Sequence, residues 1–135
     1  MNIKFASYDD IKLISTYDKH ISKNQLMSII EQNRVIIIEN AGEFVGWLRY
    51  NLFWDNTPFM NMLFILEKYR GKGFGKKLAL YWENKMKEMN YNLVMTSALS
   101  NEDSQHFYRK LNYKDAGSLL IPKEPLEIIF IKELE

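Results

Sequence analysis

The chain has 135 residues, of which 47% are hydrophobic and 26% charged, and it contains no cysteine. This balance fits one folded domain, residues 1–135, and argues against a disordered chain. A net charge of +1 provides no general attraction to nucleic acid or to a membrane, and the lack of cysteine excludes disulfides, a catalytic thiol and cysteine–zinc sites. No secretory signal or membrane-length apolar run is visible, so we expect a cytoplasmic protein.

Hydrophobic periodicity and turn residues divide the chain into strands and helices. The β-branched run at 34–39 indicates a strand, whereas the apolar residues within 74–89 recur at helical spacing. Ser22 is a suitable N-cap, and Asn112 can end a helix in the left-handed conformation. The expected strands are 2–6, 34–39, 44–53, 59–66, 92–99, 113–121 and 126–134. The expected helices begin after Ser7 or Asp9, after Ser22, at Phe74 and within 100–103.

These elements follow the order β-α-α-β-β-β-α-β-α-β-β. The strands at 59–66 and 92–99 are joined by a long helix, which predicts a parallel pair with a right-handed crossover. The other neighbouring strands are connected as hairpins. We therefore predict an α/β (α+β) fold with a single mixed, mostly antiparallel sheet and helices on both faces.

The stretch from 63 to 77 combines an apolar strand end, a turn with three glycines and a helix start. Helix starts carry unpaired N–H groups and partial positive charge, and glycine lets a ligand approach the backbone closely. These properties predict an anion site, most naturally for a phosphate. The glycine spacing fits neither a Walker A loop nor a dinucleotide fingerprint. Five cations without a nearby pair of aspartates favour a phosphate ligand bound without metal: Lys68, Arg70, Lys72, Lys76 and Lys77.

Two segments carry a family resemblance. Residues 70–75, Arg-Gly-Lys-Gly-Phe-Gly, match the Arg/Gln-x-x-Gly-x-Gly/Ala signature of the GNAT superfamily of acyl-CoA N-acyltransferases. Residues 101–113 resemble its Asn-x-x-Ala-x-x-Phe-Tyr-x-x-x-Gly-Phe motif, with Ser104 in place of Ala and Asn112-Tyr113 in place of Gly-Phe. The order of elements is also that of the family, so the resemblance covers essentially the whole domain.

The resemblance implies a sheet that splays between its fourth and fifth strands, with the pantetheine arm of acetyl-CoA in the gap. It implies that the backbone N–H of Ile65 holds the thioester carbonyl, and that Asn101 bonds the pantetheine amides. Tyr108 would act as the general acid that protonates the CoA thiolate, since a tyrosine pKa near 10 suits a thiol pKa of about 8.5. The full set of implied cofactor-binding residues is Leu63, Ile65, Arg70, Gly71, Lys72, Gly73, Phe74, Gly75, Lys76, Asn101 and Tyr108.

Helical spacing supports this role for Tyr108. If 101–111 is helical, Asn101, Ser104 and Tyr108 share a polar stripe, while Phe107 and Leu111 share an apolar one. A tyrosine that only completes the core is the alternative reading. His106 then points to solvent and His20 lies on the surface, and two histidines so far apart give no metal site.

The amine acceptor must lose a proton, but no motif selects the base. Glu67 and Asp55 are candidates, and Glu127 is a third. The region before the fourth strand is rich in aromatic residues, which together with Asp55 could form a pocket for a cation. Core packing and a homodimer interface are the alternatives for these residues, which are Trp47, Tyr50, Phe53, Trp54 and Phe59.

The sequence thus predicts transfer of an acetyl group from acetyl-CoA to a primary amine of a small molecule, with no metal. Two alternatives stay open: a CoA-binding sensor without activity, and an acetyltransferase for protein N-termini or lysines. An RNA or nucleotide binder using residues 68–77 is disfavoured by the neutral overall charge. The identity of the acceptor cannot be read from the fold.

Overall fold

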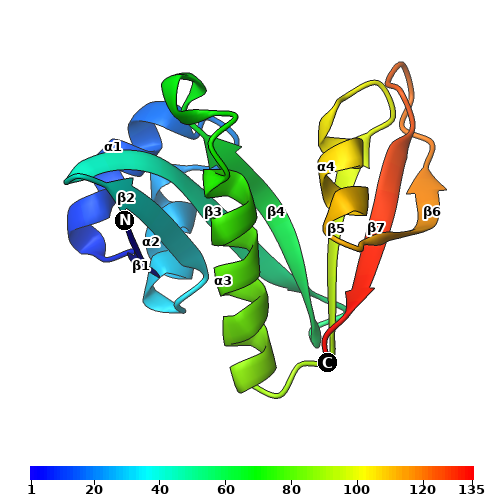
Figure 1. Cartoon of the computed structure of the whole chain (residues 1–135), viewed down its shortest axis with the longest axis horizontal. Coiled ribbons are helices and arrows are strands. Elements are labelled where there is room, and N and C mark those ends of the chain that lie inside the picture. Colours follow the sequence, from blue (N-terminus) through cyan, green and yellow to red (C-terminus); the bar gives the residue numbers. More distant parts are fainter. The chain divides into compact units, whose positions relative to one another are not determined.

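The computed structural model describes all residues from 1 to 135, and its strands and helices follow the predicted order (Figure 1). The strands are β1 (Asn2–Phe5), β2 (Val35–Asn40), β3 (Glu43–Phe53), β4 (Thr57–Ile65), β5 (Leu93–Leu99), β6 (Lys114–Leu119) and β7 (Glu127–Glu133). The helices are α1 (Ile11–Tyr17), α2 (Lys23–Glu31), α3 (Phe74–Glu88) and α4 (Ser104–Lys110), and two 3-10 turns lie at Tyr8–Asp10 and Glu67–Tyr69.

All seven strands belong to one sheet, in the order β1-β2-β3-β4-β5-β7-β6. The β4–β5 pair is parallel, with Phe59 opposite Met95 and Met60 opposite Thr96. β1–β2, β2–β3, β5–β7 and β6–β7 are antiparallel pairs. The predicted mixed sheet, with its parallel crossover through α3, is therefore confirmed.

Contacts divide the chain into two compact units, which we describe separately. The first unit comprises Met1–Tyr50 and Met62–Trp82, and the second comprises Asn51–Asn61 and Glu83–Glu135. No helix combines the length and the apolar character that a membrane crossing requires.

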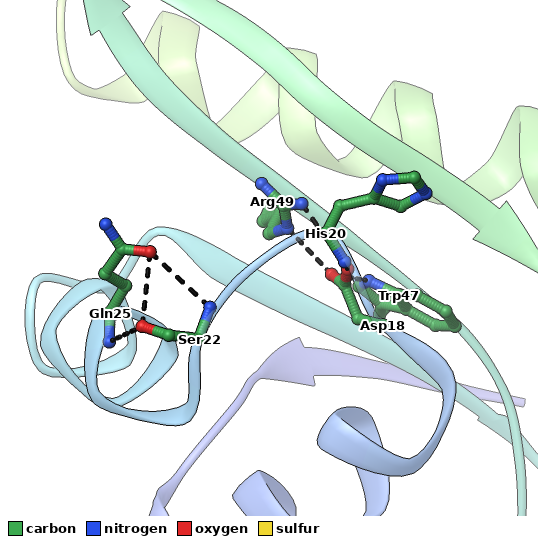
Figure 2. A network of polar contacts seen from close by, with 6 residues as sticks. All are labelled: Asp18, His20, Ser22, Gln25, Trp47 and Arg49. Atoms are coloured by element: carbon green, nitrogen blue, oxygen red, sulfur yellow. Dashed lines mark hydrogen bonds and ion pairs between the residues drawn. The ribbon is translucent and has the colours of Figure 1, made fainter.

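In the first unit, α1 and α2 cover one face of β2 and β3. Ile14 of α1 and Leu26 of α2 are fully buried. They form one hydrophobic cluster with the strand residues Val35, Ile37 and Trp47. The predicted N-cap of α2 is confirmed, since the Ser22 hydroxyl accepts a hydrogen bond from the Gln25 N–H at 3.2 Å (Figure 2). The short connector between the two helices runs from Asp18, the C-cap of α1, to Ser22, the N-cap of α2.

A bulge interrupts the pairing of β2 with β3. Ile38 lies opposite Gly46, but Glu39 lies opposite Phe44, so β3 contains one extra residue, Val45. An extra residue reverses the alternation of side chains along a strand. Phe44 therefore stacks on Trp47, at 6.1 Å between ring centroids, although the two are three positions apart.

In the second unit, α4 packs on β5, and β7 lies between β5 and β6. Phe130 of β7 is fully buried. Tyr113 donates a hydrogen bond to Glu83 at 2.9 Å, and Lys132 forms an ion pair with the same carboxylate at 2.7 Å. Asn112 has a φ of 72°, as predicted for the residue that ends this helix.

Candidate functional site

The glycine-rich loop connects the end of β4 to α3 within the first unit. Gly71 and Gly73 have φ values of 75° and 85°, which residues with a side chain rarely adopt, and a Cβ on either would meet nothing within 4 Å. The first hydrogen bond of α3 runs from Lys77 N–H to Gly73 O at 3.1 Å. The N–H groups of Phe74, Gly75 and Lys76 consequently have no partner inside the helix. The loop is open backbone at the positive end of a 15-residue helix, which suits an anion.

The five predicted cations of this stretch divide into two groups. Lys72, Lys76 and Lys77 are exposed beside the glycines. Lys68 lies over the Tyr69 ring and pairs with Glu43 at 3.7 Å. Arg70 donates from Nε to the Ile65 carbonyl oxygen at 2.7 Å. Two of the five cations are therefore engaged by the protein's own groups.

The end of β4 carries the other predicted site residues of this unit. Leu63 and Ile65 are half-buried. The N–H of Leu66, the next residue, donates to the carbonyl of Val45 at 2.8 Å, so the bulge of β3 holds the chain where β4 ends. Gly46 follows the bulge, and a Cβ there would collide with the Phe64 carbonyl oxygen. The backbones of β3 and β4 thus approach each other closely beside Ile65.

Tyr108 lies in the second unit, on α4, and is only 6% exposed. Its ring contacts Tyr113 and Phe130, at centroid distances of 5.6 and 5.9 Å. Burial raises the pKa of the Tyr108 hydroxyl to about 12; a hydrogen bond with Thr96 opposes this rise and the charge of Glu102 adds to it. The hydroxyl is therefore neutral across the physiological range, and it is a weaker acid than the sequence suggested.

The structure corrects the predicted polar stripe around Tyr108. α4 begins at Ser104, so Asn101 lies in the turn after β5 and not on the helix. Tyr108 is buried together with Leu111, the residue expected on the apolar stripe. The exposed positions of His106 and His20 agree with the predictions.

The three candidate bases differ in their environments. Glu67 lies in the 3-10 turn after β4 and Asp55 in the β3–β4 turn, and both are exposed. Glu127 is half-buried at the start of β7, opposite Leu99. Burial raises the pKa of the Glu127 carboxyl, the charge of Glu102 adds to this, and a hydrogen bond from Ser97 opposes it. Glu127 is thus the candidate whose surroundings make it a stronger base.

The five aromatic residues do not form one cluster, and the core-packing alternative applies to Trp47 and Tyr50, which are buried. Trp47 packs against Phe64, at 5.0 Å between centroids, whereas Tyr50 packs against Trp82 of α3. Residues at odd spacing on a strand point to opposite faces, which explains this separation. At the β3–β4 turn, Phe53 contacts both of the remaining aromatic residues, Trp54 and Phe59.

Sequence reasoning missed a buried polar network in the first unit (Figure 2). The Asp18 side chain is fully buried and forms an ion pair with Arg49 at 2.8 Å. It also accepts hydrogen bonds from Trp47 Nε1 and from the His20 N–H, both at 3.1 Å. Burial alone would raise the pKa of the Asp18 carboxyl, but Arg49 and these donors together lower it. Arg49 was the available signal, because an arginine inside an apolar strand needs a buried partner.

No group of three or more His, Asp or Glu side chains is arranged to hold a metal ion. The open backbone of the glycine loop is the feature best suited to a phosphate group, and three exposed lysines lie beside it.

Comparison with known proteins agrees with this architecture. Residues 5–113 match the sequence profile of the Acetyltransferase (GNAT) family, and the chain belongs to this family. Spermine/spermidine N(1)-acetyltransferase of Bacillus subtilis (strain 168) is 33% identical over 99 aligned residues. That match covers 58% of this chain and 64% of the relative, which is less than two thirds of the relative's length.

Solved structures show the same fold. Ard1 from Thermoplasma volcanium superposes with a TM-score of 0.84 at 14% identity, over 99% of this chain and 97% of that one. YncA from Salmonella typhimurium, determined with its cofactor acetyl-CoA, gives a TM-score of 0.82 at 15% identity, over 100% and 94% of the two chains.

Proposed function

We propose that this protein is an acetyl-CoA-dependent N-acetyltransferase that acts on a primary amine of a small molecule. The observation that carries the proposal is the open backbone at Gly71 and Gly73 before α3, in a chain of the GNAT family. A pyrophosphate fits this loop, because a side chain at either glycine would fill the space that the ligand needs. The acetyl-CoA bound to YncA and the polyamine specificity in the name of the Bacillus subtilis relative support the two substrate classes.

Acetyl-CoA supplies an acetyl thioester, which a neutral amine can attack directly with release of the CoA thiol. In the proposed mechanism, the amides of residues 71–76 bind the pyrophosphate. Leu63 lies along the pantetheine arm, and Asn101 bonds its amides. The N–H of Ile65 donates to the thioester oxygen as negative charge develops there. No covalent bond to the protein forms.

Two side chains manage the protons. Glu127 takes a proton from the acceptor ammonium, which is almost entirely protonated at pH 7 if its pKa is about 10. Tyr108 gives a proton to the departing sulfur and is restored from solvent. The raised pKa of Glu127 supports the first role, since a base works best when its pKa lies near the working pH.

The test measures CoA release from acetyl-CoA with spermidine, spermine, other small amines, and peptides with free N-termini or lysines. Calorimetry measures CoA affinity in parallel. We expect release with at least one small amine. CoA binding without release from any acceptor would favour the sensor, and release with peptides alone would favour a protein acetyltransferase.

A pair of glycine variants tests the loop. Gly73→Ala adds a side chain in the proposed cradle, and Gly42→Ala adds one at a φ of 79° in the β2–β3 turn, where it also meets nothing. Both cost about 1 kcal/mol of backbone strain. Only Gly73→Ala should weaken CoA binding, by about tenfold or more. Equal CoA affinity in the two variants would remove the loop from the binding site.

A further inference from the structure

We propose that Arg70 is a positioning residue: together with Gly46, it fixes the two peptide units on either side of Ile65. The sequence pattern assigned Arg70 to the phosphate cradle. The inference rests on the proposed function, in which the Ile65 N–H donates to the thioester oxygen.

Arg70 holds the peptide unit that follows Ile65. Its Nε donates to the Ile65 carbonyl oxygen at 2.7 Å, a short distance typical of a charge-assisted hydrogen bond. Its guanidinium lies over the Phe64 ring, 4.9 Å from the centroid. A planar guanidinium can stack on a ring and donate in its own plane at the same time, which an ammonium cannot do. The side chain is therefore directed back onto the end of β4.

Gly46 holds the peptide unit that precedes Ile65. The Phe64 carbonyl and the Ile65 N–H belong to this one planar unit. A Cβ on Gly46 would collide with that carbonyl oxygen and would lie 3.1 Å from Ile65 Cα. Glycine thus permits the close approach that sets the plane of the unit, and with it the direction of the Ile65 N–H.

Further contacts hold the backbone on which Arg70 and Gly46 act. Leu66 N–H bonds the Val45 carbonyl at 2.8 Å, one residue beyond the segment. Phe64, on which Arg70 lies, packs against Trp47 at 5.0 Å, and the Trp47 indole is tied to the buried Asp18 (Figure 2). Chain residues 64–66 are therefore held at successive backbone groups by β3 and by the loop.

The consequence for catalysis is preorganisation. A hydrogen-bond donor that is fixed before the reaction stabilises developing charge without reorganising, and a displacement of about 1 Å can reduce the rate by about a hundredfold. Arg70 begins the glycine-rich loop, so the same residue links the proposed phosphate site to the proposed thioester donor.

The test compares Arg70→Lys with the neighbouring cation variant Lys72→Gln. Arg70→Lys keeps the positive charge, but it loses the in-plane Nε–H and the flat stacking face. We expect kcat to fall by about 10- to 100-fold, while the Kd for CoA changes by less than about threefold. Lys72→Gln should show the opposite pattern: its main effect should be on the Kd for CoA and not on kcat. A phosphate role for Arg70 predicts that Lys substitutes well and that Arg70→Gln raises Kd.

Amide hydrogen exchange provides a readout that does not depend on turnover. In free protein, Arg70→Lys should raise the exchange rate of the Leu66 amide, which is hydrogen-bonded to Val45, by about tenfold, whereas Lys72→Gln should leave it as in the wild type. Gly46→Ala, if it folds, should reproduce the kcat loss of Arg70→Lys. Unchanged exchange at the Leu66 amide in Arg70→Lys, or a loss of CoA affinity without a fall in kcat, would overturn the proposal. Absence of turnover in the wild type would instead overturn the proposed function.

Discussion

The buried hydroxyl of Tyr108 leads to a quantitative prediction for Tyr108→Phe. A pKa of about 12 lies about two units above the value of about 10 expected in the unfolded chain. Because the pKa of Tyr108 is higher in the folded than in the unfolded state, burial of its neutral hydroxyl contributes fully to stability below pH 10. This contribution is lost as the pH rises toward 12. Two units correspond to about 2.7 kcal/mol. Phenylalanine has no ionisable group, so Tyr108→Phe should not show this loss of stability at alkaline pH.

The assay is urea unfolding of both proteins at several pH values between 8 and 12. Lysines and other tyrosines titrate in both proteins, so the difference between the two curves isolates Tyr108. Near pH 8, the variant should be less stable by about 1 kcal/mol because it loses the hydrogen bond with Thr96. By pH 12, that order should reverse. Parallel curves would refute the proposed burial of the hydroxyl.

The same variant tests the catalytic role. Removing a positioned general acid typically costs about 10²- to 10⁴-fold in rate. A complete proton transfer from a group with a pKa of 12 to a thiolate of pKa 8.5 is uphill by about 5 kcal/mol. We therefore expect kcat to fall by about 10²-fold, and the wild-type kcat to show no alkaline limb from Tyr108 below about pH 11.

Tyr113→Phe is the matched control, because Tyr113 is another buried tyrosine whose ring contacts Tyr108. Its loss leaves Glu83 still paired with Lys132. A comparable fall in kcat in both variants would assign the effect to packing, and an unchanged kcat in Tyr108→Phe would remove the proposed proton donor.

Three further predictions concern other parts of the chain. In urea unfolding, Asp18→Asn should destabilise the protein by about 3 kcal/mol, because Arg49 loses its buried partner. Glu39→Gln, which removes the partly exposed pair with Lys4, should cost less than about 1 kcal/mol, and equal effects of the two variants would contradict the buried network. The lowered pKa of Asp18 means that its stabilisation is present above about pH 4 and is lost as the pH falls through the folded-state value. Glu127→Gln should reduce kcat/KM by about 10²-fold and remove an acid limb that the wild type shows; an identical pH profile in both proteins would exclude Glu127 as the base. Trp54→Gly should raise the free energy of unfolding by about 1 kcal/mol, because Trp54 is 79% exposed at a φ of 56°, and a loss of stability would show that its contact with Phe53 matters more.

The fold could be predicted because its signals are local. A β-branched run, a serine cap and an asparagine that ends a helix fix where elements start and stop, and the long helix between two strands fixes their parallel pairing. The boundary errors occurred where a local rule was overridden. β4 begins at Thr57 and includes Pro58, although proline and a polar cluster normally mark the end of a strand.

The candidate site was predictable only where it is made of backbone. Closely spaced glycines indicate left-handed backbone positions and accessible N–H groups, so the loop at 71–76 could be recognised from its residues alone. The surroundings of Tyr108, Glu127 and Asp18 depend on partners that are distant in sequence, and so does the contact between Gly46 and Phe64. Contacts between residues distant in sequence leave no periodic pattern, which is why the acidity of Tyr108 differed from expectation. The hydrogen bond from Arg70 to the Ile65 carbonyl was not predicted either.

The extra residue in β3 has a consequence for comparing this chain with its relatives. Val45 is the bulge residue between Phe44 and Gly46, and its carbonyl oxygen accepts a hydrogen bond from the Leu66 N–H. Deleting one residue here would turn Phe44 to the opposite face and would leave the Leu66 N–H without its acceptor, whereas the exposed turn at Ala41 and Gly42 can vary in length at little cost. Alignments should therefore place gaps in that turn, and a homologue that truly lacks the residue equivalent to Val45 should differ in how its fourth strand ends.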